Sequence, residues 1–589
     1  MDNTRNLLLA VVLCGLMLLG WDAGMRYFYP QPAVEAQAEV VAQADAVDAA
    51  ATSGTREGGL TDPADIAQEE ADLETELVSA ERVQIDSPEV TGSINPVGAR
   101  IDDITLKTHR QTVKKDSGPV RILSPNGTPA QHFAEFGFIV NEERIAQNVV
   151  WESEGGPLAP GSPVTLRHDN GNGQVMTIEL SIDDHYMITA KQTIANLSEN
   201  AIIARPFGLI NRASKTASSD TWNVHSGPIG NFGDAVQFGP DYDDLAEDIA
   251  EGKTEGRAHW LGFTDIYWLS ALIPEDGSDA DADFRSLGNG LFRADLIYQP
   301  VTVAAGKQVS KTTRLFAGAK ESNVLSEYED AGVDKFGKSI DWGWFEIIAW
   351  PIWWLLTHLF GLVGNFGVAI ILLTVIIRGA LFPIAQKQFA SMAAMKAIQP
   401  KMKAIQERYK DNKQEQQQKI MALYKEEKVN PLAGCLPILI QIPIFFALYK
   451  TLLLSIEMRH QPFVLWLKDL SAPDPAHILN LFGLLPFDVP SLLAIGPLAI
   501  LLGVTMWMTF KMNPTAMDPI QQQIFNIMPW MLMFVMAPFA AGLLLYWVTN
   551  NVLTLAQQSY LYSKHPQLRA AAEKEKADKA IAAANEAKG

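Results

Sequence analysis

The stretch that most constrains the fold runs from Gly364 to Pro383, GNFGVAIILLTVIIRGALFP, an apolar run with one charged residue, Arg378. A helix rises about 1.5 Å per residue, so this run is long enough to cross the roughly 30 Å hydrocarbon layer of a membrane. Placing an arginine there costs at least about 2.5 kcal/mol, which favours a functional role. Thr374 lies one turn earlier on the same face and extends a polar stripe. The alternative is that Arg378 snorkels to the near interface.

The amino-terminal region, residues 1–30, contains a second apolar run. Residues 6–21 read NLLLAVVLCGLMLLGW after Arg5, a pattern shared by cleavable signal peptides and retained anchors. The only site that resembles a cleavage motif, Ala36 to Ala38, lies late after the run, whereas aromatic residues at 27–29 suit a membrane interface. We therefore predict an uncleaved transmembrane anchor.

Residues 31–94 are acidic, and they account for much of the net charge of −20. Residues 31–90 hold fifteen Asp or Glu against two Arg, with few large apolar side chains. Such a composition repels itself and buries little surface, so we predict a disordered linker.

Residues 95–335 change character. Short runs such as VMTIELSI (175–182) alternate with the two-residue period of half-buried strands, and Gly, Pro, Asn and Asp recur between them. This pattern predicts a large antiparallel β-sandwich domain. Its histidines are scattered, and no triad or metal-ligand spacing is recognisable. The sequence therefore predicts no enzyme activity, no metal and no cofactor.

Two segments flank the central apolar run. Residues 342–360 carry five tryptophans and Pro351, which together predict an interfacial helix. Residues 385–430 hold ten Lys or Arg against five Asp or Glu, with apolar residues at helical spacing on either side of a break at 411–412. We predict a cytoplasmic helical hairpin whose charges contact RNA or anionic lipid, or simply face solvent.

Further apolar spans are predicted at 435–456, 491–511, 524–538 and 541–560. With the anchor and the central run they make six transmembrane helices, so both termini lie on the same side. The basic hairpin and the tail at 563–589 then fall in the cytoplasm, and the sandwich falls outside. The few polar residues within the spans include no carboxylate pair and no Ser-Lys couple, so membrane-embedded hydrolysis is not indicated.

Four stretches of the sequence are similar to a known protein family: IIRGALFP, LYKEEKVNPLAGCLPILIQIPIFFALYK (423–450), PFVLWLKDLSAPDP (462–475) and GLLLYWVTNNVLTLAQQ (542–558). They resemble the YidC/Oxa1/Alb3 family of membrane protein insertases, and HWLGFTDIYWLSALIP (259–274) is similar to the periplasmic domain of the bacterial branch. The resemblance implies a five-helix insertase core at 364–562, with a hydrophilic groove, in the bacterial inner membrane. Its implied partners are nascent membrane proteins, the Sec translocon, the ribosome, the signal-recognition receptor and the phospholipid bilayer.

The resemblance also assigns candidate groove residues. Arg378 matches the family's groove arginine, Thr374 the threonine one turn above it, and Gln441 a polar groove residue; Tyr546, Trp547 and Asn550 are placed with them. Many bacterial members carry two tyrosines where this chain has Tyr546 and Trp547, so an aromatic surface is kept and a hydroxyl is lost at 547.

A rival function is a small-solute transporter or channel. Such a protein is expected to show internal repeats with paired broken helices, and the spans show no such duplication.

Overall fold

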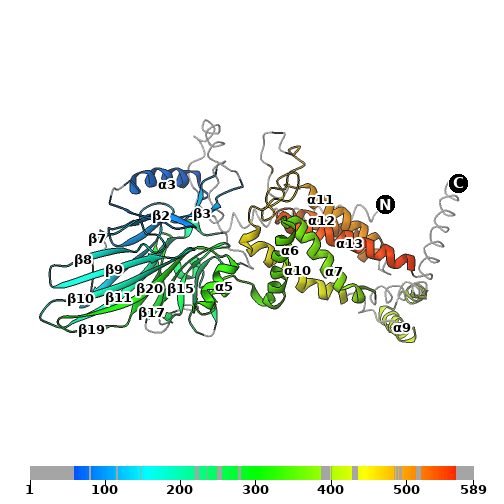
Figure 1. Ribbon diagram of the computed structural model, residues 1–589. Helices are drawn as coiled ribbons and strands as arrows, with labels where there is room; N and C mark the ends of the chain where they lie inside the picture. The colour runs from blue at the N-terminus through cyan, green and yellow to red at the C-terminus, as the bar shows by residue number, and fades with distance from the viewer. Residues whose placement is uncertain are drawn as a thin grey trace, which may run out of the picture. The chain divides into compact units, whose positions relative to one another are not determined.

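The computed structural model describes residues 59–78, 81–113, 117–145, 148–218, 224–233, 235–247, 255–275, 280–386, 398, 401–402, 404–410, 412–427, 436–482, 485, 489, 494–512 and 519–564. The predicted anchor at 1–30, the first part of the predicted linker and nearly all of the tail at 563–589 lie outside these residues. The described chain contains a β-sandwich and a helical region (Figure 1).

The predicted sandwich is confirmed as two antiparallel sheets. The order of the first is β1-β2-β3-β5-β11-β18-β17-β14, with β4, β6 and β19 paired to β3, β5 and β11, and the order of the second is β13-β12-β15-β16-β20-β10-β9-β8-β7. The first sheet comprises β1 (Val83–Asp86), β2 (Val90–Asn95), β3 (Arg100–Arg110), β4 (Pro119–Leu123), β5 (His132–Val140), β6 (Glu143–Arg144), β11 (Ile202–Ala213), β14 (Glu255–Arg257), β17 (Ala280–Gly288), β18 (Leu291–Tyr298) and β19 (Val301–Val303). The second comprises β7 (Glu152–Glu154), β8 (Val164–Asp169), β9 (Gln174–Ile182), β10 (Met187–Asn196), β12 (Gly227–Asn231), β13 (Val236–Phe238), β15 (Trp260–Thr264), β16 (Trp268–Pro274) and β20 (Lys307–Ala319).

The two-residue period in the sequence corresponds to one buried face of each strand. In β9, Met176, Ile178 and Leu180 are buried while the residues between them are half-buried or exposed. β9 pairs with β10 in register, with Leu180 opposite Ala190. Strands of the two sheets contact each other, as β11 does β16, and large aromatic side chains fill the space between them.

The boundary predicted at residue 95 is wrong. Helix α3 (Pro63–Glu76), β1 and β2 are ordered parts of the sandwich. Asp62 caps α3 by accepting a hydrogen bond from the Ala64 amide, and Glu69 accepts one from the Ala130 amide. High charge argued for disorder, but the acidic residues of α3 suit a helix on the sandwich surface. The alternation in β1, which buries Val83 and Ile85, is too short to stand out from its surroundings.

Short helices complete the sandwich part, and longer ones form the helical region. Those of the sandwich part are η2 (Ser214–Thr216), α4 (Tyr242–Ala246), α5 (Ser322–Asp330) and η3 (Phe336–Ser339). Two more adjoin the longer helices: η4 (Gly343–Phe345) leads into α6, and η6 (Ile456–Met458) follows α10. The helical region contains α6 (Glu346–Val363), α7 (Phe366–Ala380), α9 (Lys413–Glu426), α10 (Leu436–Leu454), α11 (Pro497–Met512), α12 (Pro519–Met536) and α13 (Ala541–Lys564). Helix α13 packs against α7, α10 and α11.

The start of α7 follows from three adjacent residues. Gly364 ends α6 in the left-handed conformation, with φ 65°. Asn365 caps α7 by accepting a hydrogen bond from the Val368 amide, and it donates one to the Phe463 carbonyl. A Cβ on Gly367 would lie 2.0 Å from the Phe463 ring, so only glycine fits there. These contacts fix where the helix that carries Arg378 begins.

Among the described residues, Gly343–Val363 is the one helical stretch long and apolar enough to cross a membrane by length and composition. This stretch contains α6, for which the sequence predicts an interfacial helix. Shorter apolar helices are Phe366–Ala380, Gln441–Leu454, Pro497–Met512 and Asn526–Met536. The position of α6 at the membrane interface therefore stays a prediction.

The described part of the hairpin has a small core of its own. Ile398, Met402 and Leu423 are buried together, and Ile420 and Tyr424 of α9 pack against them. These residues include most of the apolar residues whose helical spacing predicts the hairpin. Their cluster is separate from the main core of the chain.

Candidate functional site

Arg378 lies in the last turn of α7 and hydrogen-bonds to α13. Its Nε donates to Asn550 Oδ1 at 2.6 Å, and its Nη2 donates to Thr554 Oγ1 at 2.6 Å. The Arg378 side chain is half-buried, and Asn550 is buried. The hydrogen bonds satisfy part of a charged group on an otherwise apolar helix, which lowers the cost of burying that group.

Thr374 does not share this contact. It is fully buried, and its hydroxyl donates to the Ile370 carbonyl at 2.6 Å within the same helix. This i−4 bond is how a threonine satisfies its hydroxyl inside a helix. Thr374 thus lies one turn before Arg378, as the sequence indicates, with its polar atom turned to its own backbone.

Gln441 and Tyr546 are brought together by α10 and α13. Gln441 Nε2 donates to the Tyr546 hydroxyl at 2.7 Å, and the Tyr546 side chain is buried. The one hydroxyl of the Tyr546-Trp547 pair is therefore already held by a neighbouring helix.

Trp547 contacts a different side chain of α10. Its ring lies 4.9 Å from the Phe445 ring, centroid to centroid, and the side chain is half-buried. An aromatic pair in this arrangement contributes about 0.5–1.5 kcal/mol beyond the area it buries. Trp547 therefore packs against α10, and its role as an aromatic contact surface for substrate stays a prediction.

Three polar residues of α13 lie on one face because they are spaced by four. Tyr546, Asn550 and Thr554 rise along about 12 Å of the helix, and we call them the α13 stripe. Gln441 contacts its first member and Arg378 its other two. Asn551, the next residue round the helix, instead donates to Thr505 of α11 at 3.2 Å.

Thr554 is a residue of this cluster that the sequence reasoning missed. Its hydroxyl donates to the Asn550 carbonyl at 2.6 Å and accepts from Arg378. The spacing of Asn550 and Thr554, four residues apart, was the available signal, because it places both on one helical face.

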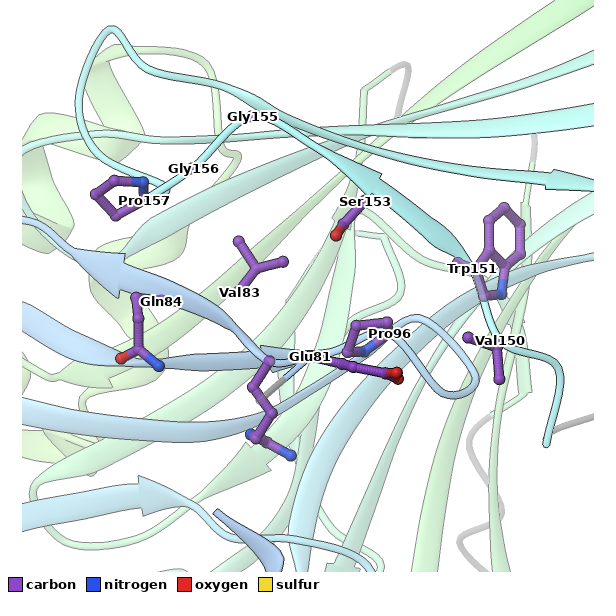
Figure 2. Close-up of a pocket in the computed structure, with 11 residues that line it drawn as sticks. Glu81, Val83, Gln84, Pro96, Val150, Trp151, Ser153, Gly155, Gly156 and Pro157 are labelled. Carbon is purple, nitrogen blue, oxygen red and sulfur yellow. The ribbon is translucent and has the colours of Figure 1, made fainter. Parts of the chain in front are cut away.

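A separate cavity lies in the sandwich, between the edge strands β1 and β7 (Figure 2). Its volume is about 580 Å³, and its lining includes Val83, Trp151 and the backbone of Gly155 and Gly156. Arg82, also in the lining, is paired with Asp102, whose pKa is raised by burial although Arg82 opposes the shift. The lining residues include no His, Cys or Lys, and in the residues that the structure describes no three His, Cys, Asp or Glu side chains gather to hold a metal ion.

Two family models match the chain. The model described as YidC periplasmic domain covers residues 82–355, which places the start of the domain at the ordered strands, and the model described as 60Kd inner membrane protein covers residues 358–568.

Proteins named membrane protein insertase YidC are similar over nearly the whole length. The chain is 41% identical to that of Beijerinckia indica over 96% of both proteins, and 41% identical to that of Zymomonas mobilis over 95% of both. It is 18% identical to a solved structure of an active YidC insertase, with a TM-score of 0.34 over 81% of this chain and 92% of the other.

The described chain combines a large β-sandwich with apolar helices, one of which carries an arginine that hydrogen-bonds to polar side chains of another. This combination is that of a helical membrane protein with a substantial domain outside the bilayer. The chain belongs to the YidC family of membrane protein insertases of the bacterial inner membrane. An insertase performs no covalent chemistry on its substrate, in agreement with the sequence prediction that this protein is not an enzyme.

Proposed function

We propose that this protein inserts nascent membrane proteins by receiving their hydrophilic segments in a groove lined by Arg378, Gln441, Trp547 and the α13 stripe. The observation that carries the proposal is the Arg378 guanidinium, hydrogen-bonded to Asn550 and Thr554 between two apolar helices. The sequence also predicts Thr374 as a groove residue; with its hydroxyl bonded to Ile370, it supports the groove by packing.

The physical role of such a groove is to lower a desolvation barrier. Moving an unpaired polar group into hydrocarbon costs several kcal/mol, and each residue of a translocated segment adds such groups. Polar side chains partway across the bilayer replace some of the lost water contacts. A positive charge in a partly dehydrated site also attracts acidic residues more strongly than it does in water.

The proposed topology has six transmembrane helices, with both termini in the cytoplasm and the sandwich in the periplasm. Helices α7, α10, α11, α12 and α13 form the five-helix core, the segment at 1–30 supplies the sixth span, and α6 lies at the interface. This arrangement is supported by charge: the segments 385–430 and 563–589, which it assigns to the cytoplasm, hold more Lys and Arg than Asp and Glu, as the cytoplasmic loops of membrane proteins do.

The proposed partners are the Sec translocon on the membrane side and the ribosome and signal-recognition receptor on the cytoplasmic side. The hairpin supports the cytoplasmic contacts, because its small core leaves basic residues such as Arg408, Lys419 and Lys425 exposed. Basic side chains of this kind attract anionic partners at low and moderate ionic strength.

Site-specific photocrosslinking tests the proposal. A photoreactive amino acid at position 378 is expected to form adducts with a nascent membrane protein stalled during insertion. The same probe at Ile347 of α6, which is highly exposed, serves as the control and should give few. A small-solute transporter, the rival function, should give no adducts from position 378 in membranes where the protein is folded and abundant.

A further inference from the structure

We propose that Asn550 and Thr554 are positioning residues that orient the Arg378 guanidinium and set the preference of the groove for acidic substrate segments. This inference rests on the proposed function. It concerns residues of α13 acting through Arg378, and it begins with the donors that the guanidinium has to offer.

An arginine side chain has five N–H donors in a fixed plane. Nε donates to Asn550 and Nη2 to Thr554, so the fork on that side of the guanidinium is occupied by α13. Nη1 donates no hydrogen bond to any residue that the structure describes. The remaining donors on Nη1 and Nη2 form a second fork, and a carboxylate can bind such a fork with both oxygens.

The Thr554 hydroxyl is itself oriented. It donates its proton to the Asn550 carbonyl at 2.6 Å, so its oxygen is left to accept from Arg378. Asn550 therefore accepts two of these hydrogen bonds: its side chain accepts from Arg378, and its backbone carbonyl accepts from Thr554. The three residues form a closed set of hydrogen bonds across α7 and α13.

These hydrogen bonds fix the orientation of the Arg378 guanidinium group. A free arginine side chain samples many rotamers, and fixing it costs entropy each time a substrate binds. Hydrogen bonds to a second helix fix the side chain before the substrate binds, so less conformational entropy is lost when a carboxylate binds. Neutral segments can accept single hydrogen bonds from the second fork but form no ion pair with it, so they gain less from its orientation.

The test measures insertion of one substrate carrying either an acidic tail or the same tail with Asn and Gln in place of Asp and Glu. The readout is the ratio of acidic-tail to neutral-tail insertion in membranes with matched amounts of full-length protein. Thr554→Val keeps the shape of the side chain and removes the acceptor, so the ratio is expected to fall about threefold to tenfold. Thr554→Ser, which keeps the hydroxyl, is expected to retain most of it.

Asn550→Asp gives a second, independent arm. A carboxylate at position 550 pairs with Arg378 and competes with the substrate, so the ratio is expected to fall at least as far as in Thr554→Val. The matched control is Thr549→Val, which removes a hydroxyl that donates to the Leu545 carbonyl on the same helix. Its ratio is expected to equal that of the wild type.

The Arg378→Ala background separates the possible failures. There, Thr554→Val should have no further effect on the ratio, because there is no guanidinium left to orient. If Thr554→Val lowers acidic-tail and neutral-tail insertion equally, Thr554 only packs the helix and the positioning role is wrong. If Arg378→Ala leaves the ratio unchanged, the electrostatic groove of the proposed function is wrong as well.

Discussion

Gln441 of α10 and Tyr546 of α13 are joined by a hydrogen bond of 2.7 Å between the side-chain amide and the phenol hydroxyl. The bond ties together two helices that also share the Phe445–Trp547 ring contact. In this chain the hydroxyl of the aromatic pair is therefore occupied, and its first role is to hold α10 against α13.

Removing that hydroxyl should destabilise the helical region modestly. Tyr546→Phe leaves the Gln441 amide without this acceptor, and side-chain hydrogen bonds between membrane helices contribute about 0.6–2 kcal/mol. We expect a loss of that size in the free energy of unfolding measured in bicelles. The double variant Gln441→Leu/Tyr546→Phe should lose less free energy of unfolding than the two single variants lose together, because neither partner is left unpaired. A loss equal to that sum or larger would contradict the pairing.

Asp474 should organise the segment that follows α10. Its carboxylate is buried and accepts hydrogen bonds from Trp466 Nε1 at 2.9 Å, from the Ala476 amide at 3.1 Å and, at the start of α11, from the Leu498 amide at 3.1 Å. Asp474→Ala leaves these donors without their acceptor and should cost about 2–4 kcal/mol locally. Limited proteolysis of this segment should become faster, more so than in Trp466→Phe, which removes one of the three bonds. Equal rates in the two variants would show that Asp474 does not organise it.

Lys320 should make the stability of the sandwich depend on pH in the alkaline range. Burial lowers the pKa of its ammonium group to about 8, although Asp265 opposes the shift, and the group donates to Thr264 Oγ1 at 3.0 Å. Between about pH 8 and the ordinary value of 10.5, the unfolded state binds more protons than the folded state. The Lys320 contribution to the free energy of unfolding therefore rises with pH over this window, by up to about 3 kcal/mol.

Urea unfolding of full-length protein at several pH values measures this contribution as the difference between wild type and Lys320→Met. The advantage of the methionine variant should be largest at or below pH 8 and should shrink toward pH 10.5. A difference that stays constant across this range would mean that Lys320 is not buried as a charge.

The hairpin should open independently of the rest of the helical region. Its core consists of few side chains, of which Leu423 of α9 is one of the most buried. Leu423→Ala should cost about 2–4 kcal/mol within the hairpin and raise hydrogen exchange across α9. Met421→Ala on the same helix, at a residue 51% exposed, is the matched control and should change little. Faster exchange in α7 or α13 would contradict the independence of the hairpin.

The sequence predicted features that depend on local pattern. The period of two in residues 175–182 and the helical spacing of the apolar residues on either side of 411–412 both correspond to buried faces in the structure. These signals are strong because a side chain's direction follows directly from its position in a strand or helix.

Features that depend on distant contacts were not legible. Thr554 is separated from Arg378 by 176 residues, and nothing local to either marks them as partners. The burial of Thr374 depends on how its helix packs against its neighbours, which periodicity alone does not determine. The ordered start of the sandwich was hidden because β1 gains its stability from pairing with β2, while its neighbours in sequence are acidic.

The central claim is that Arg378 contributes its charge to the handling of substrate segments. The most direct measurement compares insertion of acidic-tail and neutral-tail forms of one substrate by the wild type and by Arg378→Lys, Arg378→Ala and Arg378→Glu at matched membrane levels. The acidic-tail substrate should be impaired least by Lys, more by Ala and most by Glu, and the neutral-tail substrate should be less sensitive to all three. Losses that are the same for both tails and that follow the stability of the protein would show that Arg378 only anchors its helix.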